Sequence, residues 1–347
     1  MANMNIRQPR FYCDYINYRL SRGVAQDGRF DVQATNTGSN LVGIKSGGGT
    51  EAELFDMRPL NLVTFDTSAS SAAKADHVVV SLDLMGETDS KVSFVAILNH
   101  NLATATGKIR ISASDTKSHI QGANLSGATT MTCTEVVNAD AISTNVITPA
   151  TDGTTIVKFS ESDLRYWGIQ FEGSDSGDFS ATDLTVGCII VGEIMELRSP
   201  DLSLTRSIAF DKVNVRESIG GQRFSNMSSF GRQVSTTSKS PFSTATVNQQ
   251  VFGGRISYDM NFSYLASTDV MPDEYDTFNP TDDSTVEDIW NVTNGPHIPF
   301  IFSCDKDSEG DNAESEHIFA RFGQNSLDMQ QVALDTFNLS MRIEEEF

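Results

Sequence analysis

The feature that most constrains the fold of this chain is an alternation of apolar and polar residues with a period of two. In the clearest segment, Ile256–Leu265, every second residue is large and apolar. The residues that would share one face of that segment are Ile256, Tyr258, Met260, Phe262 and Tyr264. Because successive side chains of a strand point to opposite faces, the pattern predicts strands with one buried face. Further strands are expected at Val78–Leu84, Val92–Leu98, Lys108–Ser114, Ile156–Phe159, Tyr166–Phe171, Val186–Leu197, Ile298–Phe302, Ile318–Phe322 and Thr336–Glu344.

Two of these strands indicate where the cores lie. Val92–Leu98 is apolar on both faces, which is typical of a central strand in a sandwich. The last strand, Thr336–Glu344, has a complete apolar face, so we expect a core strand there and not a tail.

Helix signals are few. Ser284–Glu287 has the spacing of a capping box and predicts a short helix that ends before Gly295 and Pro296. Many short strands joined by Ser-, Thr-, Gly-, Asn- and Asp-rich turns predict an all-β fold of the sandwich or barrel class.

At 347 residues, the chain has room for two domains. A boundary is expected near Arg198–Asp201, where Pro200 interrupts the strand pattern. The expected parts are an N-terminal arm or first strand (1–33), a β-sandwich (34–200) and a second β domain (201–347) with an extended loop (222–246). The Ser/Thr-rich segment Asp201–Thr246 is read as strands plus a loop or arm that a neighbouring molecule orders.

Charge and composition exclude several classes of protein. The 25 Lys and Arg against 46 Asp and Glu give a net charge of −21, which argues against a nucleic-acid binder and against binding to anionic lipid. A hydrophobic fraction of 39% argues against an acidic disordered chain. No apolar run approaches the length of a membrane span, and the N-terminus lacks the apolar core of a signal peptide. Four well-separated cysteines are expected to be reduced thiols, as in a protein folded in a cytoplasm.

Four motifs in the first half occur in a fixed order. They are Val95–Leu102 (VAILNHNL), Ile109–Ser114, Leu164–Ile169 (LRYWGI) and Val186–Glu193 (VGCIIVGE). In this order they resemble the galactose-binding-like jelly-roll modules of bacteriophage tail and baseplate proteins. The resemblance implies a jelly-roll β-sandwich for 34–200.

The second half resembles the split β-barrel of tail-tube-like, minor tail and distal tail proteins. The matching residues are Ile256–Leu265, Trp290, Pro299–Phe302, Ala320–Phe322 and Met341–Glu345. The segment Asp201–Thr246 departs from that family's pattern.

Together the resemblances imply a non-enzymatic structural protein of a phage tail tip or baseplate, of the distal-tail or adaptor kind. Such a protein is made in the host cytoplasm and resides in the virion. It forms a homo-oligomeric ring or links the tube to fibres, and it contacts other tail proteins. The alternative is a tail adhesin, a carbohydrate-binding module that takes part in host attachment by recognising surface glycan. A glycan-degrading enzyme is a third class, for which no catalytic pair is found. No catalytic motif and no cofactor site other than a calcium loop is recognised.

Asn99-His100-Asn101 directly follows a buried strand. At the end of a sandwich, such side chains can bind sugar hydroxyls, so the triplet is the candidate glycan site. The other reading, which we favour, is a turn whose side chains bond loop backbone groups.

Asp305–Glu316 has the ligand spacing of a calcium loop. The candidate ligands are Asp305, Asp307, Glu309, Asp311 and Glu316, with Gly310 at the sharp bend. The flanking segments are expected to be strands instead of the helices of such a loop. We therefore favour an acidic hairpin loop and keep Ca²⁺ as the alternative.

Aromatic and basic residues are combined in two segments, as in the energetic centres of protein interfaces. The candidate interface residues are Tyr12, Tyr15, Tyr18, Arg223, Phe224, Phe230 and Arg232. For the three tyrosines the alternative is burial in the first strand of the fold.

Overall fold

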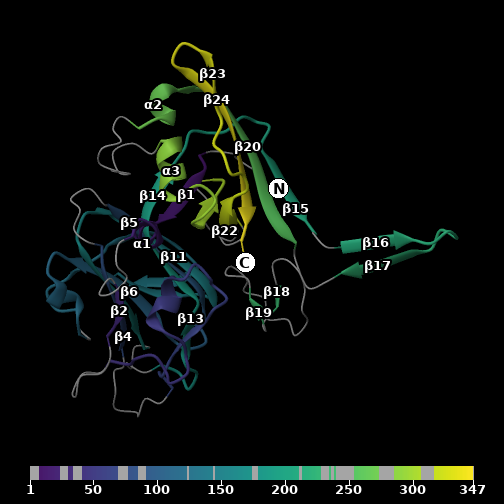
Figure 1. Ribbon diagram of the computed structural model, residues 1–347. Coiled ribbons are helices and arrows are strands. Elements are labelled where there is room, and N and C mark those ends of the chain that lie inside the picture. The colour runs from purple at the N-terminus through teal and green to yellow at the C-terminus, as the bar shows by residue number, and fades with distance from the viewer. Residues whose placement is uncertain are drawn as a thin grey trace.

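The computed structural model describes residues 8–23, 30–33, 41–68, 77–84, 91–122, 125–143, 145–173, 179–210, 213–227, 234–235, 238–239, 254–272, 285–305 and 316–346. These residues form two β-rich lobes, one from the first half of the chain and one from the second (Figure 1). The all-β prediction is confirmed.

The first lobe is a sandwich of two sheets. One sheet has the order β2 (Phe30–Val32), β4 (His77–Asp83), β12 (Tyr166–Glu172), β6 (Lys108–Ser114), β10 (Val146–Pro149) and β9 (Ala139–Ser143), with β7 (Thr129–Thr130) beside β6. The facing sheet has the order β14 (Cys188–Glu196), β5 (Val92–His100), β11 (Gly153–Ser162) and β8 (Cys133–Val137). A small sheet of β3 (Val63–Phe65) and β13 (Leu184–Val186), and the 3₁₀ helices η1 (Glu51–Phe55) and η2 (Lys117–Ile120), complete this lobe.

From β4 to β14, the main strands alternate between the two sheets, which is the arrangement of a jelly roll. The inward-facing residues have the predicted period of two. Ile109, Ile111 and Ala113 of β6 pack in the core, and Trp167 and Ile169 of β12 lie beside them. The jelly-roll prediction for this lobe is therefore confirmed.

The second lobe is one sheet with short helices on its inner face. The strands are β15 (Thr205–Ala209), β20 (Arg255–Ala266), β24 (Thr336–Glu345), β22 (His317–Phe322) and β21 (Phe300–Ser303), with β23 (Met329–Ala333) beside β24. The helices are α2 (Ser267–Val270) and α3 (Val286–Val292). Leu339, Met341 and Ile343 of β24 lie in the core, so the prediction of a C-terminal core strand is confirmed. The N-cap of α3 is Thr285, with Asp288 completing the capping box, one residue later than the sequence pattern indicated.

The two lobes share a sheet. Strand β1 (Arg10–Asp14) pairs with β14 of the first lobe, Tyr12 opposite Ile194, and with β21 of the second, Tyr12 opposite Ile301. One sheet of 11 strands therefore runs through the molecule. The part of the chain expected to form a split barrel is a further β-sheet region, whose described strands continue into the sandwich.

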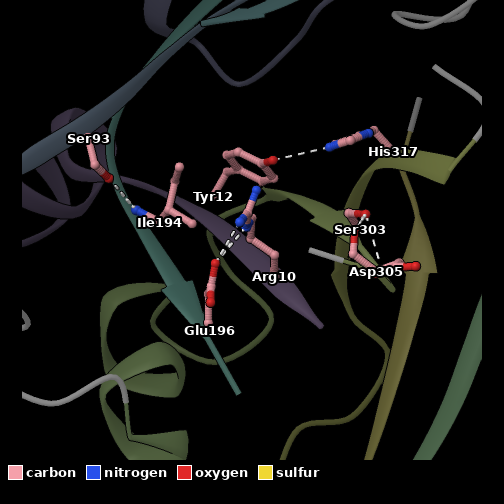
Figure 2. A network of polar contacts seen from close by, with 8 residues as sticks. All are labelled: Arg10, Tyr12, Ser93, Ile194, Glu196, Ser303, Asp305 and His317. Atoms are coloured by element: carbon pink, nitrogen blue, oxygen red, sulfur yellow. Dashed lines mark hydrogen bonds and ion pairs between the residues drawn. The ribbon is translucent and has the colours of Figure 1, made fainter. Parts of the chain in front are cut away.

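Polar contacts reinforce this seam on the face that carries Arg10 and Tyr12 (Figure 2). The guanidinium of Arg10 donates two hydrogen bonds to Glu196 Oε1 of β14, at 2.9 and 2.7 Å. The buried Tyr12 hydroxyl lies 3.1 Å from Nε2 of His317 of β22. Arg10 thus bonds the first lobe and Tyr12 bonds the second.

On the other face, helix α1 (Tyr15–Ser21) fills the space between the two cores. Asp14 caps the helix by accepting hydrogen bonds from the backbone N–H groups of Ile16 and Asn17. Ile16 packs in the first core, whereas Tyr15 and Tyr18 pack in the second.

This arrangement corrects the interface prediction for the N-terminal tyrosines. Tyr12, Tyr15 and Tyr18 are 0%, 2% and 9% exposed. Their rings are buried between the lobes of one chain, so they offer no surface to a neighbour. The segment expected as an N-terminal arm or first strand holds β1, α1 and β2.

A carboxyl group is buried at the same seam. Glu193 of β14 points toward α1 and accepts a hydrogen bond from the Tyr15 hydroxyl. Burial raises the pKa of Glu193 to about 8, and the nearby carboxylates Glu161 and Asp288 act in the same direction. The hydrogen bond from Tyr15 and the charge of Lys91 lower this pKa and offset part of the shift. Burial also raises the pKa of Asp14 to about 6. The folded chain therefore holds protons that the unfolded chain releases at lower pH.

We predict that Glu193→Gln removes the pH dependence of stability above about pH 6. With a folded pKa of about 8 against an ordinary 4.5, the wild type loses stability as pH rises between these values and no further above them. Glutamine imitates the protonated acid, so the variant is expected to be more stable at pH 8 by a few kcal/mol. Urea unfolding from pH 4 to 9 measures this.

Two comparisons complete this test. Glu217→Gln, at an exposed glutamate, is the control and should follow the wild-type curve. The slope that Asp14 causes, between about pH 4 and 6, should remain in every variant. A wild-type curve that is flat from pH 6 to 8 would contradict the buried, protonated carboxyl.

Candidate functional site

The predicted glycan triplet is placed at the end of β5, where the chain turns. Asn99 has a positive φ of 52°, a conformation that asparagine tolerates better than most residues. Its side-chain amide donates a hydrogen bond to the carbonyl oxygen of Pro59 at 2.9 Å. Asn99 is thus buried and fastens the loop that contains Pro59 to the sandwich.

His100 is buried in a second set of hydrogen bonds. Its Nδ1 accepts from the backbone N–H of Leu102 at 3.2 Å. Since Nδ1 is an acceptor, the ring proton lies on Nε2, which donates to Thr155 Oγ1 at 2.8 Å. The amide of Asn138 reaches the same hydroxyl oxygen, at 3.4 Å. The imidazole is therefore a neutral structural group.

Asn101 connects the turn to the segment before β13. Its Oδ1 accepts from the N–H of Thr185 at 2.7 Å, and its Nδ2 donates to the carbonyl of Asp183 at 2.8 Å. The three side chains of the triplet therefore bond loop and strand groups of the same chain. These bonds favour the structural reading over a sugar site at these residues.

We predict that Asn101→Ala destabilises the fold by about 1–3 kcal/mol, because the Thr185 N–H and the Asp183 carbonyl both lose their side-chain partner. Asn101→Asp keeps the acceptor and should lose less. Urea unfolding measures both variants. A stable Asn101→Ala protein that no longer binds a glycan recognised by the wild type would restore the sugar site.

The calcium-loop prediction falls mostly outside the described residues. Asp307, Glu309 and Asp311 are not among them, and only the two ends, Asp305 and Glu316, are described. Within the described part of the chain, no group of three or more His, Cys, Asp or Glu side chains has the arrangement of a metal site. The four cysteines are free, as expected. No helix that the structure describes is long and apolar enough to cross a membrane.

The most unusual surface of the molecule is a hairpin that leaves the second lobe after β15. It consists of β16 (Val213–Glu217) and β17 (Arg223–Met227), joined by a short turn, and we call residues 213–227 the arm. In Figure 1 the arm projects sideways from the body beyond β15. Two shorter strands, β18 (Val234–Ser235) and β19 (Ser238–Lys239), form a separate pair.

Apolar side chains of the arm lie on both of its faces. The register places Val213 and Val215 on one face and Phe224, opposite Arg216, on the other. Every residue of β16 is exposed, Phe224 is 57% exposed, and Ile219 at the turn is fully exposed. A two-stranded hairpin with neither face covered is at best marginally stable in water. Among the described residues, the arm therefore has the character of a segment that another molecule covers.

The candidate interface residues of this region divide into two groups. Arg223 and Phe224 lie on β17 and are exposed, and Arg223 forms a 3.3 Å ion pair with Glu217 across the hairpin. Phe230 and Arg232 lie outside the described residues.

The charge of this region is opposite to that of the rest of the chain. The segment Asp201–Thr246 has six basic and three acidic residues, a net charge of +3, so the remainder carries −24. The arm itself has Arg216, Arg223 and Glu217, a net charge of +1, so contact between the arm of one copy and the acidic body of another is electrostatically favourable.

A second polar surface lies on the outer side of the seven-stranded sheet. Arg165 donates two hydrogen bonds to Asp83, at 2.7 and 2.9 Å, and its guanidinium lies over the ring of Tyr166 at 4.8 Å. Tyr166 is partly exposed, with Ser114 on the neighbouring strand. The LRYWGI motif contains Arg165 and Tyr166, but they were not predicted as a site, because a position in a strand does not by itself reveal which ring reaches the surface.

No family model matches this chain, and no curated protein matches it. Solved β-sandwich modules are similar to about half of it. A chitosan-binding module from a chitosanase/glucanase of Paenibacillus sp. IK-5 is 14% identical, with 43% of this chain and 89% of the module covered and a TM-score of 0.29. A pectin-binding carbohydrate-binding module is 14% identical, with 49% and 93% covered and a TM-score of 0.28. A CBM32 module produced by Clostridium perfringens is 10% identical, with 48% and 96% covered and a TM-score of 0.28. Because these identities and TM-scores are low, the fold is assigned from the strand pairing of the chain itself.

Proposed function

We propose that this protein is a non-enzymatic structural subunit of a phage tail tip or baseplate, and that it assembles with copies of itself through the arm. The observation that carries the assembly role is the arm, whose apolar side chains are exposed on both faces. The placement in a phage tail comes from the resemblance of the two sequence halves to tail proteins. In this proposal the chain is made in the host cytoplasm and ends in the virion.

The architecture suits a subunit that must hold a contact element at a fixed position. The shared strand β1 and helix α1 join both cores, so the body behaves as one unit from which the arm extends. Full burial of a large apolar side chain contributes about 1.5–3 kcal/mol. Four such side chains on the arm, Val213, Val215, Ile219 and Phe224, supply enough to offset part of the cost of association, which is about 4–15 kcal/mol. Because one arm contact offsets only part of this cost, assembly requires many such contacts in one closed or extended structure.

We predict that the double variant Ile219→Asp, Phe224→Asp keeps the wild-type melting temperature but does not assemble. Both side chains are exposed in the single chain, so the core is unaffected, whereas two buried carboxylates would oppose docking. Light scattering after size exclusion measures the mass, and calorimetry the melting temperature.

Leu60→Asp is the matched control for this experiment, since Leu60 is a similarly exposed leucine on the first lobe. It should assemble like the wild type. A wild type that remains monomeric at every concentration, with no tail partner added or present, would contradict self-assembly through the arm.

Glycan binding is the second candidate function, on a different surface from the predicted triplet. The cluster of Tyr166, Arg165 and Asp83 combines a partly exposed ring with a fixed guanidinium and carboxylate. An aromatic face and polar groups held in a defined geometry are the elements of a small-ligand site. This candidate corresponds to a tail adhesin.

For this candidate we predict that Tyr166→Ala lowers glycan affinity about tenfold or more, because the ring provides the apolar contact. A glycan array with the full chain finds the ligand, and titration calorimetry compares the variant with Asn101→Asp, which lies at the other surface. If no glycan binds the wild type, or if Tyr166→Ala binds equally well, the adhesin function is excluded for this cluster.

A further inference from the structure

We propose that the surface that receives the arm is the α2 end of the second lobe on another copy of this chain, so that copies join head to tail. This inference rests on the proposed function, because it presumes assembly through the arm. It adds the identity of the acceptor and the symmetry of the assembly.

The acceptor surface is an exposed apolar cluster around α2. Its members are Tyr264 at the end of β20, Met271 after α2, and Val332 and Leu334 at the β23–β24 turn. The turn and the helix are joined by a hydrogen bond from the Ser267 N–H to the Asp335 carbonyl at 3.2 Å. In Figure 1, α2 and the β23–β24 turn lie together at the top of the lobe. Leu334 is 86% exposed, which is unusual for a leucine in a well-formed hairpin.

A bulge in β20 places Tyr264 on this surface. The alternation of Ile256–Leu265 predicts that Tyr264 faces the core, but the register shifts between Phe262 and Leu265 and Leu265 takes the buried position. Tyr264 is 73% exposed, at a φ of 58° that tyrosine rarely adopts, and its N–H donates to Asn338 Oδ1 at 2.9 Å. Bulges that redirect a side chain commonly mark functional surfaces.

A cavity of about 250 Å³ opens beside the same helix. Its apolar walls are Leu197, Phe262, Leu265 and Val286, and its polar rim consists of Glu196, Arg198, Thr268, Asp269 and Thr285. The volume is sufficient for one large side chain such as Phe224 or Ile219 of an incoming arm. The apolar walls match these side chains, and the rim carboxylates Glu196 and Asp269 lie in ion pairs with Arg10 and Arg198.

The arm of the same chain cannot reach this surface. The chain enters the arm after Ala209, which pairs with Arg255 at the first residue of β20, whereas α2 follows Ala266 at the last residue. The two ends of this 12-residue strand are separated by roughly 40 Å. Figure 1 shows the arm directed away from α2. The occupant must therefore come from a second copy.

The charges of the two surfaces are complementary. Asp269 and Asp335 lie at the acceptor, together with Asp201, which accepts a hydrogen bond from Ser263 beside Tyr264. Arg198 pairs with Asp269 and is the basic residue that the described acceptor contributes. The arm itself has two arginines and one glutamate, a net charge of +1.

Because donor and acceptor are different surfaces, the contact is heterologous. Successive contacts of this kind close into a ring or extend as a filament, whereas reciprocal exchange of arms between two copies would stop at a two-fold dimer. The proposal thus predicts a ladder of cross-linked species from a chain that carries one cysteine on each surface.

The experiment is cross-linking of the full chain with a short bismaleimide. The double variant Ile219→Cys, Leu334→Cys is expected to give dimers, trimers and higher species, whereas each single variant stays uncross-linked. Cys13, Cys188 and Cys304 are buried, and the wild type measures the background from Cys133. The matched control is Ile219→Cys, Leu60→Cys, which should give no ladder.

The other outcomes separate the two proposals. Cross-linked dimers from Ile219→Cys alone would mean that arms pair with each other, and a ladder from the Leu60 control would place the acceptor on the first lobe. Either result, or an assembled wild type without any cross-link in the Leu334 variant, overturns the acceptor but leaves assembly through the arm. A wild type that light scattering finds monomeric throughout overturns both.

Discussion

The hydrogen bonds of β1 with β14 on one edge and β21 on the other are the interaction on which the rest of the structure depends. Without β1, the sandwich and the second lobe would be separate sheets, each with an open edge. With it, Phe11 enters the second core, where its ring contacts Phe300, Phe302 and Phe322. Inter-lobe geometry is thereby set by main-chain bonds, which tolerate little rotation.

Close approach at the end of β1 adds a second constraint. Gly192 of β14 lies so near the chain that a Cβ there would be 1.9 Å from the Cys13 carbonyl oxygen. The chain then turns into α1 at Asp14, and Glu193 is left facing the seam. Burial of this carboxyl is unfavourable when it is charged. Glu193 therefore lowers the stability of the fold as the pH rises from about 4.5 to about 8. The hydrogen bond from Tyr15 is the compensation that the fold provides.

The rigidity of the body determines where the arm is held relative to the rest of the molecule. The apolar residues of the arm and those around α2 are exposed at opposite ends of β20, and a stiff lobe fixes the direction from one to the other. In the proposed assembly, repetition of that direction from copy to copy would define the curvature of a ring or filament. The polar cluster of Tyr166 lies on the first lobe, whereas the arm and the α2 surface belong to the second.

Local pattern predicted the strands well, because period-two alternation reflects burial of one face directly. Examples are β6, with Ile109, Ile111 and Ala113 inward, and β24, with Leu339, Met341 and Ile343 inward.

Pairing between β1 and β21 joins residues almost three hundred positions apart, and no local signal specifies it. The same limit explains the error at Tyr12, whose burial depends on His317 from a distant strand. The exposure of Tyr264 follows from a bulge that alternation conceals. The turn at Asn99–Asn101 could be read from residue chemistry, whereas Tyr166 required the sheet to be assembled first.

Hydrogen exchange followed by mass spectrometry, at low and high protein concentration, tests most directly whether a rigid body docks its arm on the next copy. Amides of β1 should exchange only with global unfolding at both concentrations, as expected for the shared strand of two cores. Peptides from the arm and from 264–271 should exchange rapidly in the dilute protein and become protected together in the concentrated one. Arm peptides that exchange equally fast at both concentrations, or β1 amides that open as readily as the arm, would contradict the account.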